Sequence, residues 1–126
     1  MFTVFDKKIS ISRGDTGLLK ITVTGVELTE NDRAEFLIAT PSCKGEAHIL
    51  LRAVLKPSED LTSFEMPFLN TDTIKWEPGS YVWQFRVFTN AVLDDDGMLI
   101  GGDETYTPYL PKPFEVLKVV GVDDDN

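Results

Sequence analysis

The segment WEPGSYVWQFRV (Trp76–Val87) decides the fold, because its Pro-Gly turn leads directly into a strand with strict alternation of side chains. Successive side chains of a strand point to opposite faces, so Gln84 and Arg86 are expected in water. The opposite face is expected to be buried against a second layer of the protein. It carries a row of large side chains: Tyr81, Trp83, Phe85 and Val87.

Similar alternation predicts further strands along the chain, bounded by Gly, Pro, Asn and Asp. The expected strands are 9–12, 19–24, 32–40, 46–56, 64–68, 88–92, 98–100 and 114–120. Arg13–Gly17 is expected to join the first two strands as a tight connection. Pro67 has no amide hydrogen, so strand 64–68 is expected to lie at an edge. Four further residues are expected in the core: Ile21, Val23, Phe36 and Ile38.

This pattern predicts an all-β protein, an antiparallel immunoglobulin-like β-sandwich of about seven to nine strands. At most one short helical turn is expected, near Asn70–Trp76, with Asn70 or Thr71 as its cap. Tyr81 fits the tyrosine corner of such folds, in which the hydroxyl bonds to the backbone a few residues upstream. Trp83 stands two residues later, where those folds often place a disulfide cysteine.

Length and charge limit the classes of function. The chain has 126 residues and a net charge of −9, so we expect one domain (1–120), with an acidic, disordered tail (121–126). The negative charge disfavours nucleic acid as a partner. No apolar run approaches the roughly 20 residues of a membrane span. The start of the chain lacks the pattern of a signal peptide, which predicts synthesis in the cytoplasm.

No motif predicts an enzyme, a cofactor or a metal ion. Cys43 is the only cysteine and His48 the only histidine, and nothing in the sequence brings them together. Asp94–Asp96 crowds carboxylates but lacks the EF-hand spacing, so a solvated hairpin turn is favoured over an ion site. For the acid pairs Glu59–Asp60 and Asp103–Glu104, exposure to solvent at the surface is favoured over acid-base catalysis. Arg13-Gly14-Asp15 matches an integrin-binding tripeptide, but a role in a turn is favoured because Gly14 can take positive φ and Asp15 can bond backbone amides.

Apolar residues on the outer sides of two strands point to a protein contact. This possible interface consists of Leu50, Val54, Val82 and Phe88. The alternative is that loops or the last strand cover these side chains. The sequence leaves both readings open.

Three segments carry a resemblance to known proteins. They are ISISRGDT (9–16), DRAEF (32–36) and PGSYVWQFR (78–86), followed by Phe114-Glu115-Val116 near the end. In this order they resemble small structural proteins of phages and prophages. The chain is similar to the amino-terminal β-sandwich module of baseplate and tail-fibre proteins from phages of Gram-positive hosts.

The resemblance implies a non-enzymatic virion protein of the tail or baseplate, or an assembly factor, acting through protein-protein association. Other virion proteins and further copies of the chain are the implied partners, and the virion is the implied location after synthesis in the bacterial cytoplasm. An alternative is a carbohydrate- or cell-surface-binding module, in which exposed rings stack on sugars. The rings that could form such a platform are Trp76, Phe88, Tyr106 and Tyr109.

Overall fold

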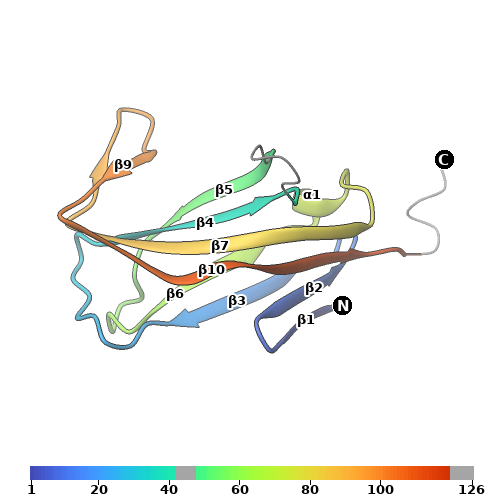
Figure 1. Cartoon of the computed structure of the whole chain (residues 1–126), viewed down its shortest axis with the longest axis horizontal. Coiled ribbons are helices and arrows are strands. Elements are labelled where there is room, and N and C mark those ends of the chain that lie inside the picture. Colours follow the sequence, from blue (N-terminus) through green and yellow to red (C-terminus); the bar gives the residue numbers. More distant parts are fainter. Residues whose placement is uncertain (42–47, 120–126) are drawn as a thin grey trace.

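The computed structural model describes residues 1–41 and 48–119, apart from the side chains of residues 108–110. The regular secondary structure of this part of the chain is almost entirely strand, which confirms the prediction of an all-β protein (Figure 1). It contains more strands than expected, together with one helical turn: β1 (Phe2–Phe5), β2 (Lys8–Ser12), β3 (Gly17–Thr22), β4 (Arg33–Ala39), β5 (Ile49–Leu55), β6 (Ser63–Phe68), α1 (Asn70–Thr73), β7 (Gly79–Thr89), β8 (Val92–Leu93), β9 (Leu99–Gly101) and β10 (Glu104–Leu117).

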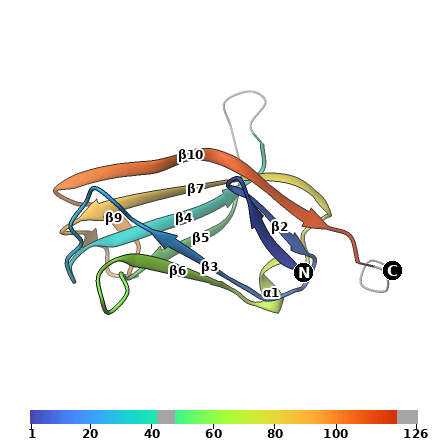
Figure 2. The same ribbon diagram turned by 90° about the horizontal axis from the view of Figure 1, so that it is seen from below.

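The strands form a large sheet, a small sheet and a separate hairpin. The large sheet has six strands in the order β1-β2-β10-β7-β4-β5, while β3 pairs with β6 and β8 pairs with β9. Figure 2 shows β3 and β6 lying across one face of the large sheet. The predicted purely antiparallel pairing is wrong at one place, because β10 runs parallel to β2. Antiparallel pairing with β7 fixes the direction of β10, and β2 runs the same way.

Residues 13–16 form the predicted tight connection between β2 and β3, but the two strands do not pair with each other. Strand β2 pairs with β1 and β10, whereas β3 lies in the other sheet, so residues 13–16 cross from one layer to the other. Alternation shows which side chains face inward but not which strands are neighbours. The crossing brings Ile9 and Ile11 of one layer together with Leu19 and Ile21 of the other in one buried core.

Aromatic rings hold the two layers together. Phe68 of β6 contacts Phe36 of β4 and Phe114 of β10, with ring centroids 5.8 and 5.9 Å apart. Phe64 of β6 contacts Phe85 of β7 at 5.6 Å. Of the residues expected in the core, Tyr81 and Val23 are partly buried and pack against it. The others are buried: Ile21, Phe36, Ile38, Trp83, Phe85 and Val87.

Trp83 links the centre of the large sheet to its first hairpin. Its indole ring stacks on Phe36, with centroids 5.7 Å apart, and its Nε1–H donates a hydrogen bond to the Lys7 carbonyl at 3.0 Å. Asp6 and Lys7 both have positive φ, 50° and 65°, as a two-residue type I′ turn requires. The hydrogen bond satisfies the polar atom of an otherwise apolar side chain in the core.

Tyr81 forms the predicted tyrosine corner. Its hydroxyl donates a hydrogen bond to the Glu77 carbonyl at 2.5 Å, and its ring packs on Trp76 with centroids 5.6 Å apart. Burial, and then the nearby Glu77 charge, raises the pKa of the Tyr81 hydroxyl above its ordinary value. The hydroxyl therefore keeps its proton and remains a donor.

The remaining differences from the sequence predictions concern the ends of elements. The helical turn α1 is shorter than expected, and Leu69 rather than Asn70 or Thr71 precedes it, with the Leu69 N–H donating to Asp72 at 2.7 Å. Strand β6 pairs with β3 and otherwise makes one isolated bridge, as the edge prediction required. The predicted tail and the start of strand 46–56 lie outside the described residues.

The tyrosine corner is testable by removing a single oxygen. Tyr81→Phe is expected to lower the free energy of unfolding by about 1 kcal/mol, because the Glu77 carbonyl loses its donor. Tyr106→Phe is the matched control, since the Tyr106 hydroxyl bonds to Glu104 at the protein surface. Urea unfolding followed by tryptophan fluorescence measures both. Equal losses for the two variants would contradict a structural role for the corner.

Candidate interaction surface

The four residues of the possible interface belong to two strands that are separated by a third. Leu50 and Val54 are in β5, Val82 and Phe88 are in β7, and β4 lies between these strands. Phe36 of β4 faces the core, so its neighbours in sequence face the outer surface of the large sheet. The structure therefore places the four residues on one sheet without bringing them into a single patch.

Phe88 does not belong to an exposed surface, so for this residue the alternative applies, in which other parts of the chain cover the side chain. Only 8% of Phe88 is exposed. The Arg86 guanidinium lies 5.0 Å from the centre of its ring. The backbone of Gly102 passes close by, since a Cβ atom at this glycine would lie 3.3 Å from the Phe88 Cβ. The turn before β10 and a neighbouring cation thus cover the ring.

A polar strip crosses the middle of the outer surface. Glu35 of β4 stands opposite Arg86 of β7 and Val54 of β5. Its carboxylate lies 3.5 Å from Nε of Arg52, although the side chain is largely buried. A buried carboxylate needs such partners to offset the loss of water. The strip separates Val54 and Phe88 from the apolar end of the sheet.

An apolar groove lies at the end of the sheet where β7 begins and β4 ends. It has a volume of about 480 Å³, and none of the described residues that line it is charged. Leu50, the extra residue at a register shift between β4 and β5, directly follows Ile49 of the groove in sequence. Six residues form most of its wall: Leu37, Ala39, Pro41, Ile49, Val82 and Pro111.

Sequence reasoning identified Val82 of this groove but not the residues opposite it. The signal was present in the third predicted strand, where Leu37 and Ala39 alternate with the inward-facing Phe36 and Ile38 and are also apolar. A strand that is apolar on both faces indicates cover on both faces. Pro41 and Pro111 carried no such signal, because both lie outside the predicted strands, although Pro111 proves to be in β10.

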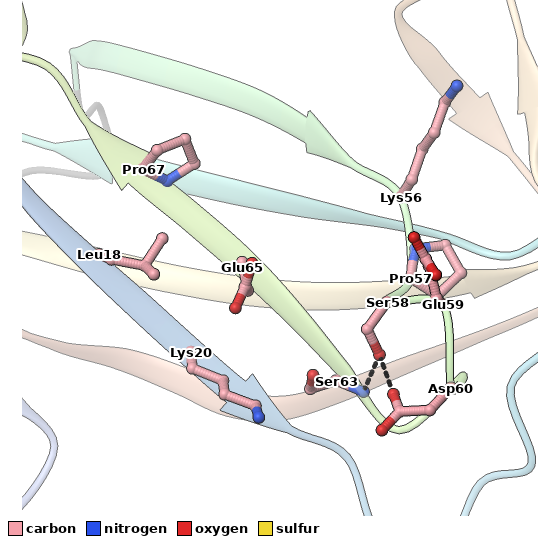
Figure 3. Close-up of a pocket in the computed structure, with 10 residues that line it drawn as sticks. All are labelled: Leu18, Lys20, Lys56, Pro57, Ser58, Glu59, Asp60, Ser63, Glu65 and Pro67. Atoms are coloured by element: carbon pink, nitrogen blue, oxygen red, sulfur yellow. Dashed lines mark hydrogen bonds between the residues drawn. The ribbon is translucent and has the colours of Figure 1, made fainter.

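A second, polar hollow of about 790 Å³ lies over the outer surface of the small sheet (Figure 3). Lys20 of β3 stands opposite Glu65 of β6, and Leu18 stands opposite Pro67. At one end the Ser58 hydroxyl donates to Asp60 at 2.6 Å and accepts from the Ser63 amide at 3.1 Å. Cationic, anionic and hydroxyl-bearing side chains therefore line this hollow along the two strands.

Asp60 is held by its own turn. The hydroxyls of Ser58 and Thr62 donate to its carboxylate, and these hydrogen bonds lower its pKa below the ordinary 3.8. A general acid or base at neutral pH needs the opposite shift. Asp60 of the Glu59–Asp60 pair accordingly serves the turn between β5 and β6.

The Arg13-Gly14-Asp15 tripeptide is engaged with α1. Nε of Arg13 donates to the Ile74 carbonyl at 2.8 Å, and the Gly14 amide donates to the Thr73 hydroxyl at 2.9 Å. Gly14 has a φ of 83°, and a Cβ atom there would lie 2.7 Å from Cδ1 of Ile74. The glycine is therefore required by the connection between the two layers.

The Asp94–Asp96 segment forms the turn of the β8–β9 hairpin. One carboxylate oxygen of Asp94 accepts hydrogen bonds from the amides of Asp96 and Met98, both at 2.9 Å. Gly97 has the positive φ that such a turn needs. Among the described residues, no group of three or more acidic, His or Cys side chains is arranged to hold a metal ion.

Two of the rings proposed as a sugar platform, Trp76 and Phe88, lie toward opposite ends of β7. Trp76 packs against Tyr81 and Phe114 at one end of β7, whereas Phe88 is buried near the other end. Tyr106 stands opposite Val87. The side chain of Tyr109 lies outside the described part, and so does Cys43. His48 directly precedes β5, where its backbone bonds to Thr40.

Comparison of the sequence with family models and curated proteins identifies no relative. The sequence matches no model of a protein family, and a search of curated proteins gives no significant match. Within the described residues, no helix is long and apolar enough to span a membrane. The resemblance to phage proteins thus rests on the residue patterns alone.

The lowered pKa of Asp60 predicts a specific pH dependence. A carboxylate with a depressed pKa stabilises the fold above its unfolded pKa, near 3.8, and loses this effect as the pH falls through its lower folded value. Asp60→Asn is therefore expected to melt below the wild type at neutral pH, and this difference should shrink in acid. Glu59→Gln is the control for losing one exposed charge. Melting curves that shift equally for both variants at every pH would contradict the prediction.

Proposed function

We propose that this protein is a non-enzymatic structural or assembly protein of a phage or prophage virion, part of the tail or baseplate, that acts by protein-protein association. Its partners are other tail proteins and further copies of itself. It is made in the bacterial cytoplasm and ends in the virion. The motifs from Ile9 to Thr16 and from Pro78 to Arg86 support the lineage, and the surface of the large sheet supports the mode of action.

One observation carries the mode of action, namely the edge strand β5. Within the described residues β5 is a seven-residue strand that pairs only with β4, and Ile49 and Leu50 on it are exposed. Its single charge, on Arg52, is paired with Glu35. Soluble proteins usually protect such edges with charges or proline, because unpaired amides and carbonyls attract another strand. An apolar edge beside an apolar groove favours a contact with protein.

The immunoglobulin-like class of the fold belongs to the same proposal. It is supported by the tyrosine corner at Tyr81 and by Trp83 between the two layers. The small sheet has only two strands and the large sheet contains a parallel pair, in contrast to the larger antiparallel sheets of immunoglobulin domains. The proposed likeness to immunoglobulin domains therefore concerns how the core is packed around β7, and does not extend to the number and direction of the strands.

The alternative, a carbohydrate-binding module, has weaker support. A sugar platform needs several rings exposed side by side. Phe88 is buried and Trp76 packs on the core, so neither ring is presented together with Tyr106. The proposal likewise assigns no catalytic residue and no cofactor.

The proposal predicts association that depends on β5. Sedimentation velocity over a wide concentration range should show oligomers, and co-expression with proteins encoded beside this chain should give a complex. Leu50→Lys is expected to weaken this association at least about tenfold, because a buried leucine contributes roughly 1.5–3 kcal/mol. Leu18→Lys, an exposed leucine of the small sheet, is the control. A monomer at every concentration that captures no neighbouring protein would refute the proposal.

A further inference from the structure

Three neighbouring strands of the large sheet carry positive charge in an otherwise acidic protein. Strands β7, β4 and β5 lie side by side in this order (Figure 1). Together they contain three arginines, no lysine and a single acid, whereas the whole chain has a net charge of −9. We call the four charged residues the arginine face: Arg33, Glu35, Arg52 and Arg86.

The arginine face lies on the outer surface of the sheet and forms one cluster. Phe36 points into the core, so Arg33 and Glu35 on the same strand point outward. Arg86 stands opposite Glu35 in the ladder, and Arg52 contacts the Glu35 carboxylate. Arg33 is therefore a diagonal neighbour of Arg86, with Cα atoms about 7–8 Å apart. The spacing of strands places the Cα atoms of Arg52 and Arg86 about 12 Å apart.

Glu35 neutralises only part of the charge of this face. It is 7% exposed, and its ion pair is with Arg52. Arg33 donates to two backbone carbonyls, both at 2.7 Å, and Arg86 lies over the ring of Phe88. These partners are neutral, and among the described residues no carboxylate forms an ion pair with Arg33 or Arg86. Two positive charges on the outer surface are thus left without an anion.

The surroundings of these charges favour carboxylates of a protein over phosphate groups. Phosphate sites commonly add free backbone amides to the cationic side chains. Strands β4 and β7 each pair on both sides, so their amides belong to the ladders of the sheet. The uncharged neighbours of the arginines on this surface include Leu37 and Val54, which are apolar. Arginine beside apolar side chains is typical of contacts between proteins.

We infer that the arginine face binds an acidic segment of a partner protein, whose carboxylates pair with Arg33 and Arg86. This deepens the proposed function, on which it rests, by naming the chemistry of the partner. Opposite charges guide two proteins into one orientation and speed their association. Arg52 belongs to the edge strand β5, so the charged contact borders the strand edge that carries the proposed association. The two contacts are compatible within one interface.

Nuclear magnetic resonance of the ¹⁵N-labelled full chain, titrated with an oligoglutamate peptide, tests the inference. At about 0.1 M salt the Debye length of about 10 Å preserves the local attraction and screens the distant acids. The Nε signals of Arg33 and Arg86 and the amides around Glu35 should shift. Arg33→Gln and Arg86→Gln should each weaken binding about 2- to 10-fold, and the double variant more strongly. Raising the salt to about 1 M should abolish the shifts.

Lys20→Gln, which removes an exposed cation of the small sheet, is the matched control and should bind the peptide like the wild type. The amide spectrum of each variant shows whether it is folded. Absence of shifts, or equal weakening by Lys20→Gln, overturns the inference.

Two further outcomes separate the inference from its alternatives. Binding of polyphosphate without binding of oligoglutamate makes the face a phosphate site and overturns the protein partner. A wild type that associates through β5 but does not bind oligoglutamate overturns the inference alone. A wild type that binds oligoglutamate, yet stays monomeric and captures no neighbouring protein, keeps the acidic ligand and overturns the proposed function.

Discussion

The structure depends on the contact of Phe68 with the large sheet. This one ring lies against Phe2, Phe36 and Phe114, which come from three different strands of that sheet. The small sheet has only two strands, and a two-stranded unit is barely stable by itself in water. It persists because Phe64, Met66 and Phe68 bury one of its faces completely. The outer surface of the large sheet keeps its shape only while this inner surface is covered.

Clamping the inner face leaves the other face of the large sheet on the outside of the protein. Glu35, Arg52 and Arg86 give the middle of the outer face a polar character. The apolar groove lies on one side of this strip, and the β8–β9 hairpin extends from the far end of the same strand. Hydrogen bonds within turns hold the carboxylates of Asp60 and Asp94 in place.

The sequence predicted which side chains face inward more successfully than it predicted which strands are neighbours. Alternation is a local property, so it located β2, β4, β6 and β7 and placed Phe36 and Phe85 in the core. Pairing depends on distant partners, so the crossing at residues 13–16 and the parallel β2–β10 pair were not foreseen. Strand β1 also escaped prediction, because it is held mainly by its ladder with β2 and has little burial of its own.

The candidate surface was only partly predictable for the same reason. Val82 was recognised because it alternates with core rings, but the burial of Phe88 depends on Arg86 and on the passage of Gly102, a residue distant from it in sequence. The groove requires Leu37, Val82 and Pro111 to meet from three strands. No local pattern encodes such a meeting. The tyrosine corner was predictable because Tyr81 and Glu77 are only four residues apart.

The most direct test of this account is the stability of Phe68→Ala against that of Phe5→Ala. Phe68 is 1% exposed and Phe5 is 82% exposed, so the two variants remove the same ring from opposite environments. Loss of the buried ring is expected to lower the free energy of unfolding by about 3–5 kcal/mol, and loss of the exposed ring by less than about 0.5 kcal/mol. Chemical denaturation measures both values. A Phe68→Ala variant as stable as Phe5→Ala would contradict the claim that this ring joins the two layers.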